Sequence, residues 1–86
     1  MPKQYSRGAQ IAYVPHHAKD DISHYDVEFG FVTGQRGSTV FCRYWSRSNP
    51  NELRTKANSE GADVSLIRPY ISHDQDTVDE LLKVMP

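Results

Sequence analysis

Imidazole and carboxylate side chains are concentrated in a polar segment near the start of the chain, which contains His16, His17, His24, Asp26 and Glu28. Histidine nitrogens and carboxylate oxygens can bind Zn²⁺ or another divalent cation, and the same groups can transfer protons in catalysis. Asp26 and Glu28 alternate along the chain, so in a strand both would point to one face. A metal site built here would use His17, His24, Asp26 and Glu28.

The spacing of these residues favours a structural role over a metal site. The segment has no closely spaced ligand pair of the zinc-binding type, and Cys42 is the single cysteine of the chain. We therefore expect His17 or His24 to tie a long loop together by hydrogen bonds with Asp26, Glu28 or backbone groups, with no metal or other cofactor bound. Acid–base catalysis is the least favoured interpretation, because a chain of 86 residues has little room for a pocket.

Positive charge is concentrated in the middle of the chain, between residues 36 and 56. This segment has one acid, Glu52, against five cations: Arg36, Arg43, Arg47, Arg54 and Lys56. Aromatic residues lie among them, and this combination is typical of proteins that contact phosphates and stack bases. The segments 19–28 and 74–83 are acidic, however, and the net charge is −1. Nucleic-acid binding through the five cations is therefore an alternative, and a solvated hairpin face is the favoured interpretation.

Aromatic residues could also form a protein-binding surface, and six of them are candidates: Tyr13, Tyr25, Phe31, Tyr44, Trp45 and Tyr70. Small barrels bind peptides through exposed aromatic grooves, although in a short chain most aromatic side chains are needed in the core. Protein recognition also tolerates mixed charge and often uses arginine and aromatic anchors. The residues that we expect to contact a protein partner are Tyr25, Arg43, Tyr44, Trp45 and Arg47.

Short apolar runs separated by turn residues predict five strands. The strands are expected at residues 10–14, 27–33, 39–45, 53–59 and 64–70. A polar segment at 16–26 predicts a long loop, and a turn at 34–37 joins the second and third strands into a hairpin. Gly30 lies inside the second strand, which indicates a bend, a bulge or the close approach of another backbone.

The C-terminal segment predicts one short helix over residues 76–84. Thr77 and Glu80 fit a capping box, and four apolar residues follow at helical spacing: Val78, Leu81, Leu82 and Met85. A helix this short is not stable alone, so we expect its apolar face to pack on the rest of the domain rather than on a partner.

Together these elements predict a mainly β fold, a single domain of residues 1–86 built as a small five-stranded SH3-like barrel with one short C-terminal helix. A five-stranded OB-type barrel is the alternative, and residues 1–7 are expected to be flexible. Cys42 lies within an apolar run, which predicts a buried and inert thiol. The lone cysteine, the lack of a secretion signal and the lack of a bilayer-spanning apolar run together predict a cytoplasmic protein.

Three segments resemble a family of small phage and prophage proteins: residues 8–18 (GAQIAYVPHHA), 24–32 (HYDVEFGFV) and 41–45 (FCRYW). Members of that family carry the signature Y-V-P-x-H-A … H-P-D-x-E-x-G-x-V, followed by a strand that ends in Arg-aromatic. The resemblance covers residues 8–59 and implies an SH3-like barrel. Two departures fall in the long loop, where Asp20-Asp21 replaces the Gly-Asp of the family and Tyr25 replaces its Pro.

Enzyme motifs, such as a glycine-rich phosphate loop or a nucleophile next to a base, are absent from the sequence. We therefore expect a phage- or prophage-type accessory binding protein, not an enzyme, that recognises a protein partner from phage or host. The alternatives are nucleic-acid binding through the basic hairpin and metal binding through the His/acid loop. We expect a monomer or a weak homodimer with no membrane partner.

Overall fold

The computed structural model describes residues 3–54 and 58–85 and has the mainly β fold that the sequence predicts. Its strands are β1 (Gln10–Tyr13), β2 (Glu28–Arg36), β3 (Thr39–Tyr44), β4 (Glu60–Asp63) and β5 (Ile67–Pro69). Two short 3₁₀ helices are η1 (His16–Ala18) and η2 (Val64–Leu66), and the C-terminal helix is α1 (Gln75–Lys83). The prediction of five strands followed by one short helix is confirmed.

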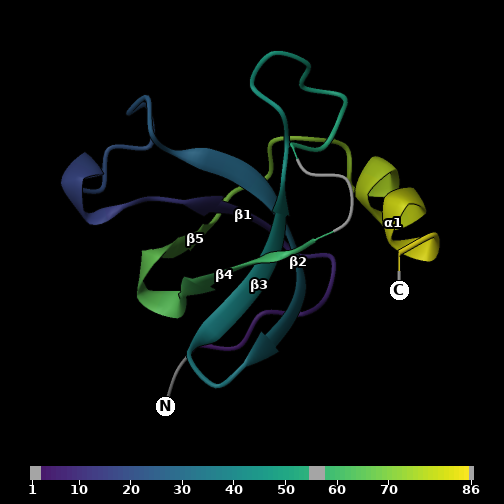
Figure 1. Cartoon of the computed structure of the whole chain (residues 1–86), viewed down its shortest axis with the longest axis horizontal. Helices are drawn as coiled ribbons and strands as arrows, with labels where there is room; N and C mark the ends of the chain where they lie inside the picture. Colours follow the sequence, from purple (N-terminus) through teal and green to yellow (C-terminus); the bar gives the residue numbers. More distant parts are fainter. Residues whose placement is uncertain (1–2, 55–57, 86) are drawn as a thin grey trace.

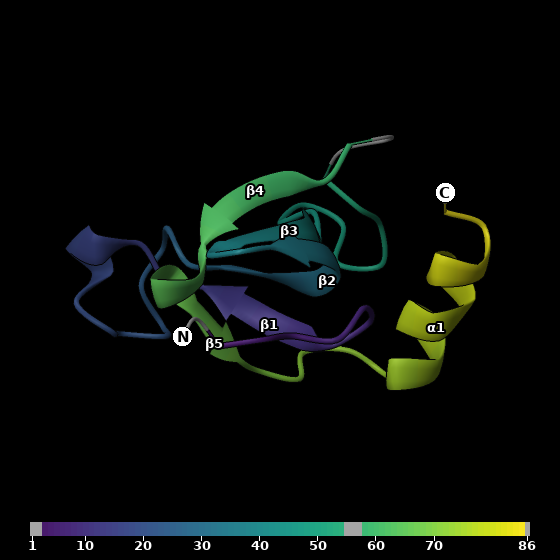
Figure 2. The same cartoon turned by 90° about the horizontal axis from the view of Figure 1, so that it is seen from below.

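The five strands form one antiparallel sheet in the order β4-β3-β2-β1-β5. Figures 1 and 2 show this sheet strongly bent, with the η1 loop at one end of the molecule and α1 at the other. This small antiparallel sheet with one C-terminal helix fits the predicted small β fold, and the 3₁₀ turn η2 leads into the last strand. Pairing among the described residues ends at β4 and β5, so the sheet is bent without closing into a complete barrel.

The predicted hairpin is confirmed as β2 and β3, but its turn lies later than expected. The strands pair as far as Arg36 with Thr39, so the turn is Gly37-Ser38, and Gly37 has a φ of 59° that glycine tolerates best. The register shifts between Val32 and Gly34, which marks a bulge. At Gly30 the neighbouring strand comes so close that a Cβ would lie 2.0 Å from the carbonyl oxygen of Arg43.

Two of the predicted strands differ from the structure. The prediction of a strand at 53–59 is wrong over the described part, because Leu53 makes an isolated bridge to Trp45 and β4 begins at Glu60; residues 55–57 lie outside the described residues. The predicted strand at 64–70 is shortened by η2. There the side chain of Asp63 accepts a hydrogen bond from the backbone N–H of Ser65 at 2.9 Å, and this local bond favours a turn over an extended chain.

The core consists of three clusters of buried side chains. The central cluster contains Ile11, Val32, Val40, Cys42, Tyr44 and Ile67. A second cluster contains Ala12, Val14, Ala18 and Val27, and it anchors the β1–β2 loop to the sheet. A third contains Phe31, Trp45 and Val78, and it attaches α1. Neighbouring residues in a strand face opposite sides. Val32 of β2 therefore packs in the central cluster, and Phe31 of β2 packs in the cluster that contacts α1.

Helix α1 packs on its own domain, as the spacing of its apolar residues predicts. Val78 is fully buried against Phe31 and Trp45, with Leu81, Leu82 and Met85 around it. The predicted capping box at Thr77 is wrong: the helix begins earlier, and the side chain of Asp74 caps it by accepting the N–H of Asp76 at 2.9 Å. Among the described residues no helix is long and apolar enough to cross a membrane.

The N-terminal residues make more contacts than the prediction of a flexible segment at 1–7 implies. The backbone N–H of Tyr5 donates to Oε1 of Gln35 at 2.9 Å, and the guanidinium of Arg7 donates to the carbonyl of Thr33 at 3.0 Å. Tyr5 also packs against the central cluster. Residues 3–7 therefore extend along the hairpin, and residues 1–2 lie outside the described part.

We expect the thiol of Cys42 to be unreactive in the folded protein. Cys42 is fully buried, and burial raises its pKa to about 11. Only about 0.1% of the thiol is then ionised at pH 8, and the thiolate is the reactive form. Alkylation by iodoacetamide at pH 8, followed by mass spectrometry, should therefore leave the native protein unmodified and label the unfolded protein in guanidinium completely. Rapid labelling of the native protein would contradict this burial.

Candidate functional site

A groove of about 630 Å³ lies where the β1–β2 loop, the β3–β4 loop and the segment between β5 and α1 meet. Its volume is within the range of about 300–1,000 Å³ that is usual for ligand sites. Its apolar lining comes from Ile22, Tyr25, Val27, Phe29, Trp45, Pro50 and Tyr70. Because four of these seven are aromatic, we call this feature the aromatic groove.

One wall of the aromatic groove is the stacked pair Trp45 and His73, whose rings lie 3.9 Å apart at an angle of 15°. Nε2 of His73 donates a hydrogen bond to the carbonyl of Pro50 at 2.6 Å, which links the β3–β4 loop to the segment before α1. The buried amide of Gln10 bonds both backbone groups of His73, at 2.8 and 3.0 Å. This wall is therefore tied directly to β1.

Tyr25 stands at the rim of the aromatic groove, with 80% of its surface exposed. The guanidinium of Arg47 lies 4.6 Å from the centre of the Tyr25 ring. Arg47 also donates hydrogen bonds to the carbonyls of Tyr25 and Val27. Arg47 thus holds the loop that presents the Tyr25 ring to solvent.

A second exposed apolar region continues from the groove along the chain after β5. The rings of Tyr70 and Phe29 lie 4.9 Å apart, and Tyr70 remains 43% exposed. Ile71 follows Tyr70 and is 77% exposed, and Ile22 is another exposed apolar residue of the lining. Exposed apolar residues that border a groove are typical of an interaction site.

Of the residues predicted to contact a protein partner, some line the aromatic groove and others do not. Tyr25, Trp45 and Arg47 line the aromatic groove, and of these three Trp45 is only 5% exposed. Arg43 and Tyr44 are almost fully buried and are not part of its lining. Burial raises the pKa of the Tyr44 hydroxyl, and this ring belongs to the central core cluster. Arg43 and Tyr44 therefore lie outside the aromatic groove, and their contact with a partner stays a prediction.

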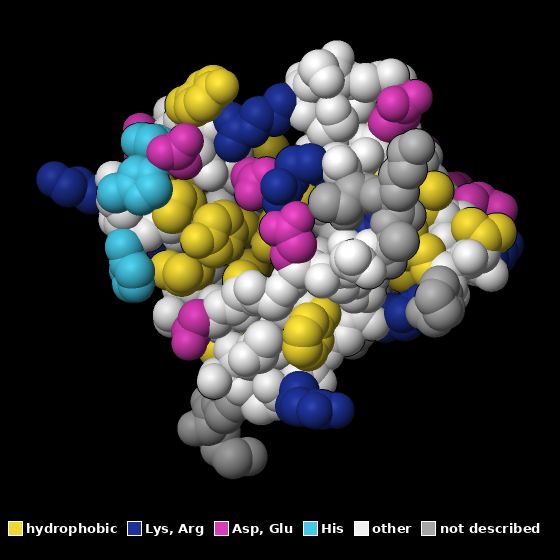
Figure 3. Space-filling model, viewed as in Figure 1, with side chains coloured by type: hydrophobic (Ala, Val, Ile, Leu, Met, Phe, Trp, Pro, Cys, Tyr) yellow, Lys and Arg dark blue, Asp and Glu magenta, His cyan; other side chains and the backbone are white. Residues whose placement is uncertain are grey.

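The cations predicted to bind nucleic acid lie in different environments in the structure. Arg43 is buried, Arg47 donates to loop carbonyls, and Arg54 forms ion pairs with Glu28 at 3.0 Å and Glu60 at 2.7 Å. Arg36 is exposed at the end of β2, and Lys56 lies outside the described residues. Figure 3 shows Lys and Arg side chains beside Asp and Glu on the viewed face, next to a patch of hydrophobic side chains. Three of the four described cations are therefore buried or bonded within the protein.

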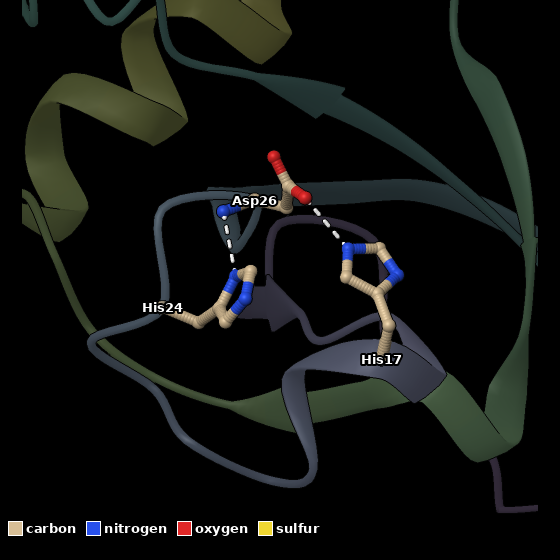
Figure 4. A group of neighbouring side chains, drawn as sticks. All are labelled: His17, His24 and Asp26. Carbon is tan, nitrogen blue, oxygen red and sulfur yellow. Dashed lines mark hydrogen bonds and ion pairs between the residues drawn. The ribbon is translucent and has the colours of Figure 1, made fainter.

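The histidine loop has the hydrogen bonds that the sequence predicts. Nε2 of His17 donates to Oδ2 of Asp26 at 2.6 Å, and the backbone N–H of Asp26 donates to Nδ1 of His24 at 3.0 Å (Figure 4). The hydrogen bond from His17 is the main reason that the pKa of Asp26 is lowered. The two histidine rings meet edge to face, with centres 5.3 Å apart.

Glu28 does not belong to this histidine cluster, which corrects the predicted set of ligands. Its carboxylate is paired with Arg54. The predicted common strand face of Asp26 and Glu28 is also wrong, because β2 begins at Glu28 and Asp26 lies in the turn before it. The interactions that gather the cluster are thus confined to the β1–β2 loop.

Comparisons of this chain with protein-family models, with curated proteins and with solved structures found no match. The interpretation of the groove therefore depends on its own geometry. Sequence reasoning missed His73 and Gln10, which fix the groove wall. No motif or spacing connects these two residues with Trp45, so the sequence contained no signal that could have identified them.

Proposed function

We propose that this chain is a small accessory binding protein that recognises a segment of a protein partner in the aromatic groove and catalyses no reaction. The proposal of a phage or prophage origin comes from the sequence resemblance. The proposal of a reducing compartment such as the cytoplasm comes from the lone, buried Cys42. The partner is a phage or host protein, and the chain acts as a monomer or weak homodimer.

The observation that carries this proposal is the exposed Tyr25 ring at the rim of an aromatic groove that is held in place from several sides. Tyrosine and arginine are among the usual anchors of protein interfaces, and Tyr25 and Arg47 supply both at this groove, whereas the nearly buried Trp45 forms its wall. The loop carrying Tyr25 is bonded to Arg47, and the opposite wall is bonded to Gln10. A groove ordered in advance loses less entropy when a partner binds.

We expect Tyr25→Ala to weaken binding at least about tenfold, because a dominant interface anchor contributes about 2 kcal/mol or more. The test is to select ligands for the wild-type protein from a displayed library of random peptides and to measure their affinities by calorimetry. Val84→Ala is the matched control, since Val84 is 81% exposed and lies outside the groove lining. Selected peptides that bind wild type and Tyr25→Ala equally well would contradict the proposal.

Nucleic-acid binding is the rival function, and a gel-shift assay near physiological salt distinguishes it. The burial of Arg43 and the ion pairs of Arg54 argue against it. We expect no shift of duplex or single-stranded DNA or RNA. A shift that weakens steeply with salt, and that is lost in the double variant Arg36→Ala/Arg47→Ala, would favour the rival.

A further inference from the structure

The cluster of His17, His24 and Asp26 brings metal-binding atoms closer together than its spacing in the sequence suggests. One possible ligand atom from each residue lies within 4.8 Å of the other two. Around a tetrahedral zinc ion, with bonds of about 2.1 Å, ligand atoms lie about 3.4 Å apart. Side-chain movements of about 1 Å would therefore bring all three atoms to coordination distance of one ion.

The backbone of the loop holds these three residues in place through its own hydrogen bonds. The N–H of Asp21 donates to the carbonyl of Ala18 at 3.0 Å, that of His24 to Asp21 at 3.0 Å, and that of Val27 to His24 at 3.1 Å. His17 is held in η1, and Ala18 beside it is buried in the second core cluster. The loop backbone therefore positions these three residues even when no metal is bound.

The cluster is also open to an ion from solvent. The side chains of His17 and Asp26 are 62% and 49% exposed, so an ion can approach both without displacing core residues. The hydrogen bond between them is an exposed pair, and such pairs contribute little to stability. A metal ion would therefore displace two exposed hydrogen bonds, the one from His17 to Asp26 and the one from the N–H of Asp26 to Nδ1 of His24.

We propose that His17, His24 and Asp26 bind one divalent transition-metal ion of the zinc class. Two imidazole nitrogens and one carboxylate oxygen favour Zn²⁺, Co²⁺ or Ni²⁺ over Mg²⁺ and Ca²⁺, which prefer ligand sets made of oxygen. Three protein ligands leave a fourth position for water. His24 also lines the aromatic groove, so the ion lies at the groove rim. The site is independent of the protein-binding proposal.

Calorimetric titration of Zn²⁺ into chelator-treated protein tests the site. We expect one ion per chain at micromolar affinity or tighter, no competition from Mg²⁺, and shifts of the His17 and His24 ring signals in NMR spectra. His17→Ala and Asp26→Asn should each weaken binding at least about tenfold. His16→Ala is the matched control, because His16 neighbours His17 in η1 and is exposed but does not belong to the cluster.

Circular dichroism of the metal-free variants shows whether the fold is retained. His17→Ala is the most informative variant, since its ring contacts are with the exposed Asp26 and with His24. Binding that does not saturate in the millimolar range would overturn the proposal. Binding that His16→Ala weakens as much as His17→Ala, or that leaves the His17 and His24 signals unshifted, would also overturn it.

Discussion

Replacement of Gly30 by alanine should destabilise this protein by at least about 3 kcal/mol, or prevent its folding. A Cβ at this position would lie 2.0 Å from the carbonyl oxygen of Arg43 and 2.9 Å from the Cα of Tyr44. Both atoms belong to the backbone of β3, so no side-chain rotation relieves the clash. The strands must separate, which weakens the pairing of Gly30 with Tyr44 beside the groove.

Gly34→Ala is the matched control for this prediction. Gly34 lies in the same strand, and a Cβ there has no neighbour within 4 Å. We expect Gly34→Ala to change the free energy of unfolding by less than about 0.5 kcal/mol. Urea unfolding, followed by circular dichroism, compares the two variants. Equal stabilities would show that the strands are farther apart at Gly30 than the structure describes.

Replacement of Phe31 by alanine should cost about 3–5 kcal/mol, the range for removing a buried phenylalanine. Phe31 is fully buried, and its ring lies 5.7 Å from that of Trp45. It also belongs to the cluster that holds Val78 of α1. Its removal would leave a cavity between the sheet, the helix and the groove wall. The total stability of a small domain is about 5–15 kcal/mol, so this variant should lose a large share of its stability.

Fluorescence of Trp45, the single tryptophan, can follow unfolding in urea, with circular dichroism as a second probe. Phe31→Leu should cost less than Phe31→Ala because it leaves a smaller cavity, and it keeps the test informative if Phe31→Ala does not fold. Tyr25→Ala should cost less than about 0.5 kcal/mol, because that ring is largely exposed. Similar losses for Phe31→Ala and Tyr25→Ala would contradict the burial that the structure assigns to Phe31.

Local pattern was sufficient to predict the elements whose residues have regular apolar spacing. The first strand, the hairpin and the C-terminal helix were all predicted, and β3 differs from its predicted range by a single residue. The burial of Cys42 was predicted for the same reason. The hydrogen bonds between the two histidines and Asp26 were predicted because imidazole and carboxylate groups in one loop can pair with each other.

Prediction failed where the chain has little periodicity. The expected strand at 53–59 is polar, and the strand that pairs with β3 is instead Glu60–Asp63. The helix start was misplaced because Asp74 and Thr77 are both acceptable caps by residue type, and the sequence does not show which of them begins the helix. Arg43 and Tyr44 of β3 were expected at a surface. Strand alternation indicates which residues share a face of the sheet, but it does not show that other segments cover both faces.

By itself, the sequence determined the class of fold, the order of the elements and the residues from which a site could be built. The tertiary structure decided which of those residues are accessible: it buries Arg43 and Tyr44, exposes Tyr25, and pairs Glu28 with Arg54. It also brings His73 onto Trp45, across 28 positions of the chain. The physical reason is that strand and helix periodicity are local properties, whereas burial and pairing depend on contacts between segments that only the folded sheet brings together.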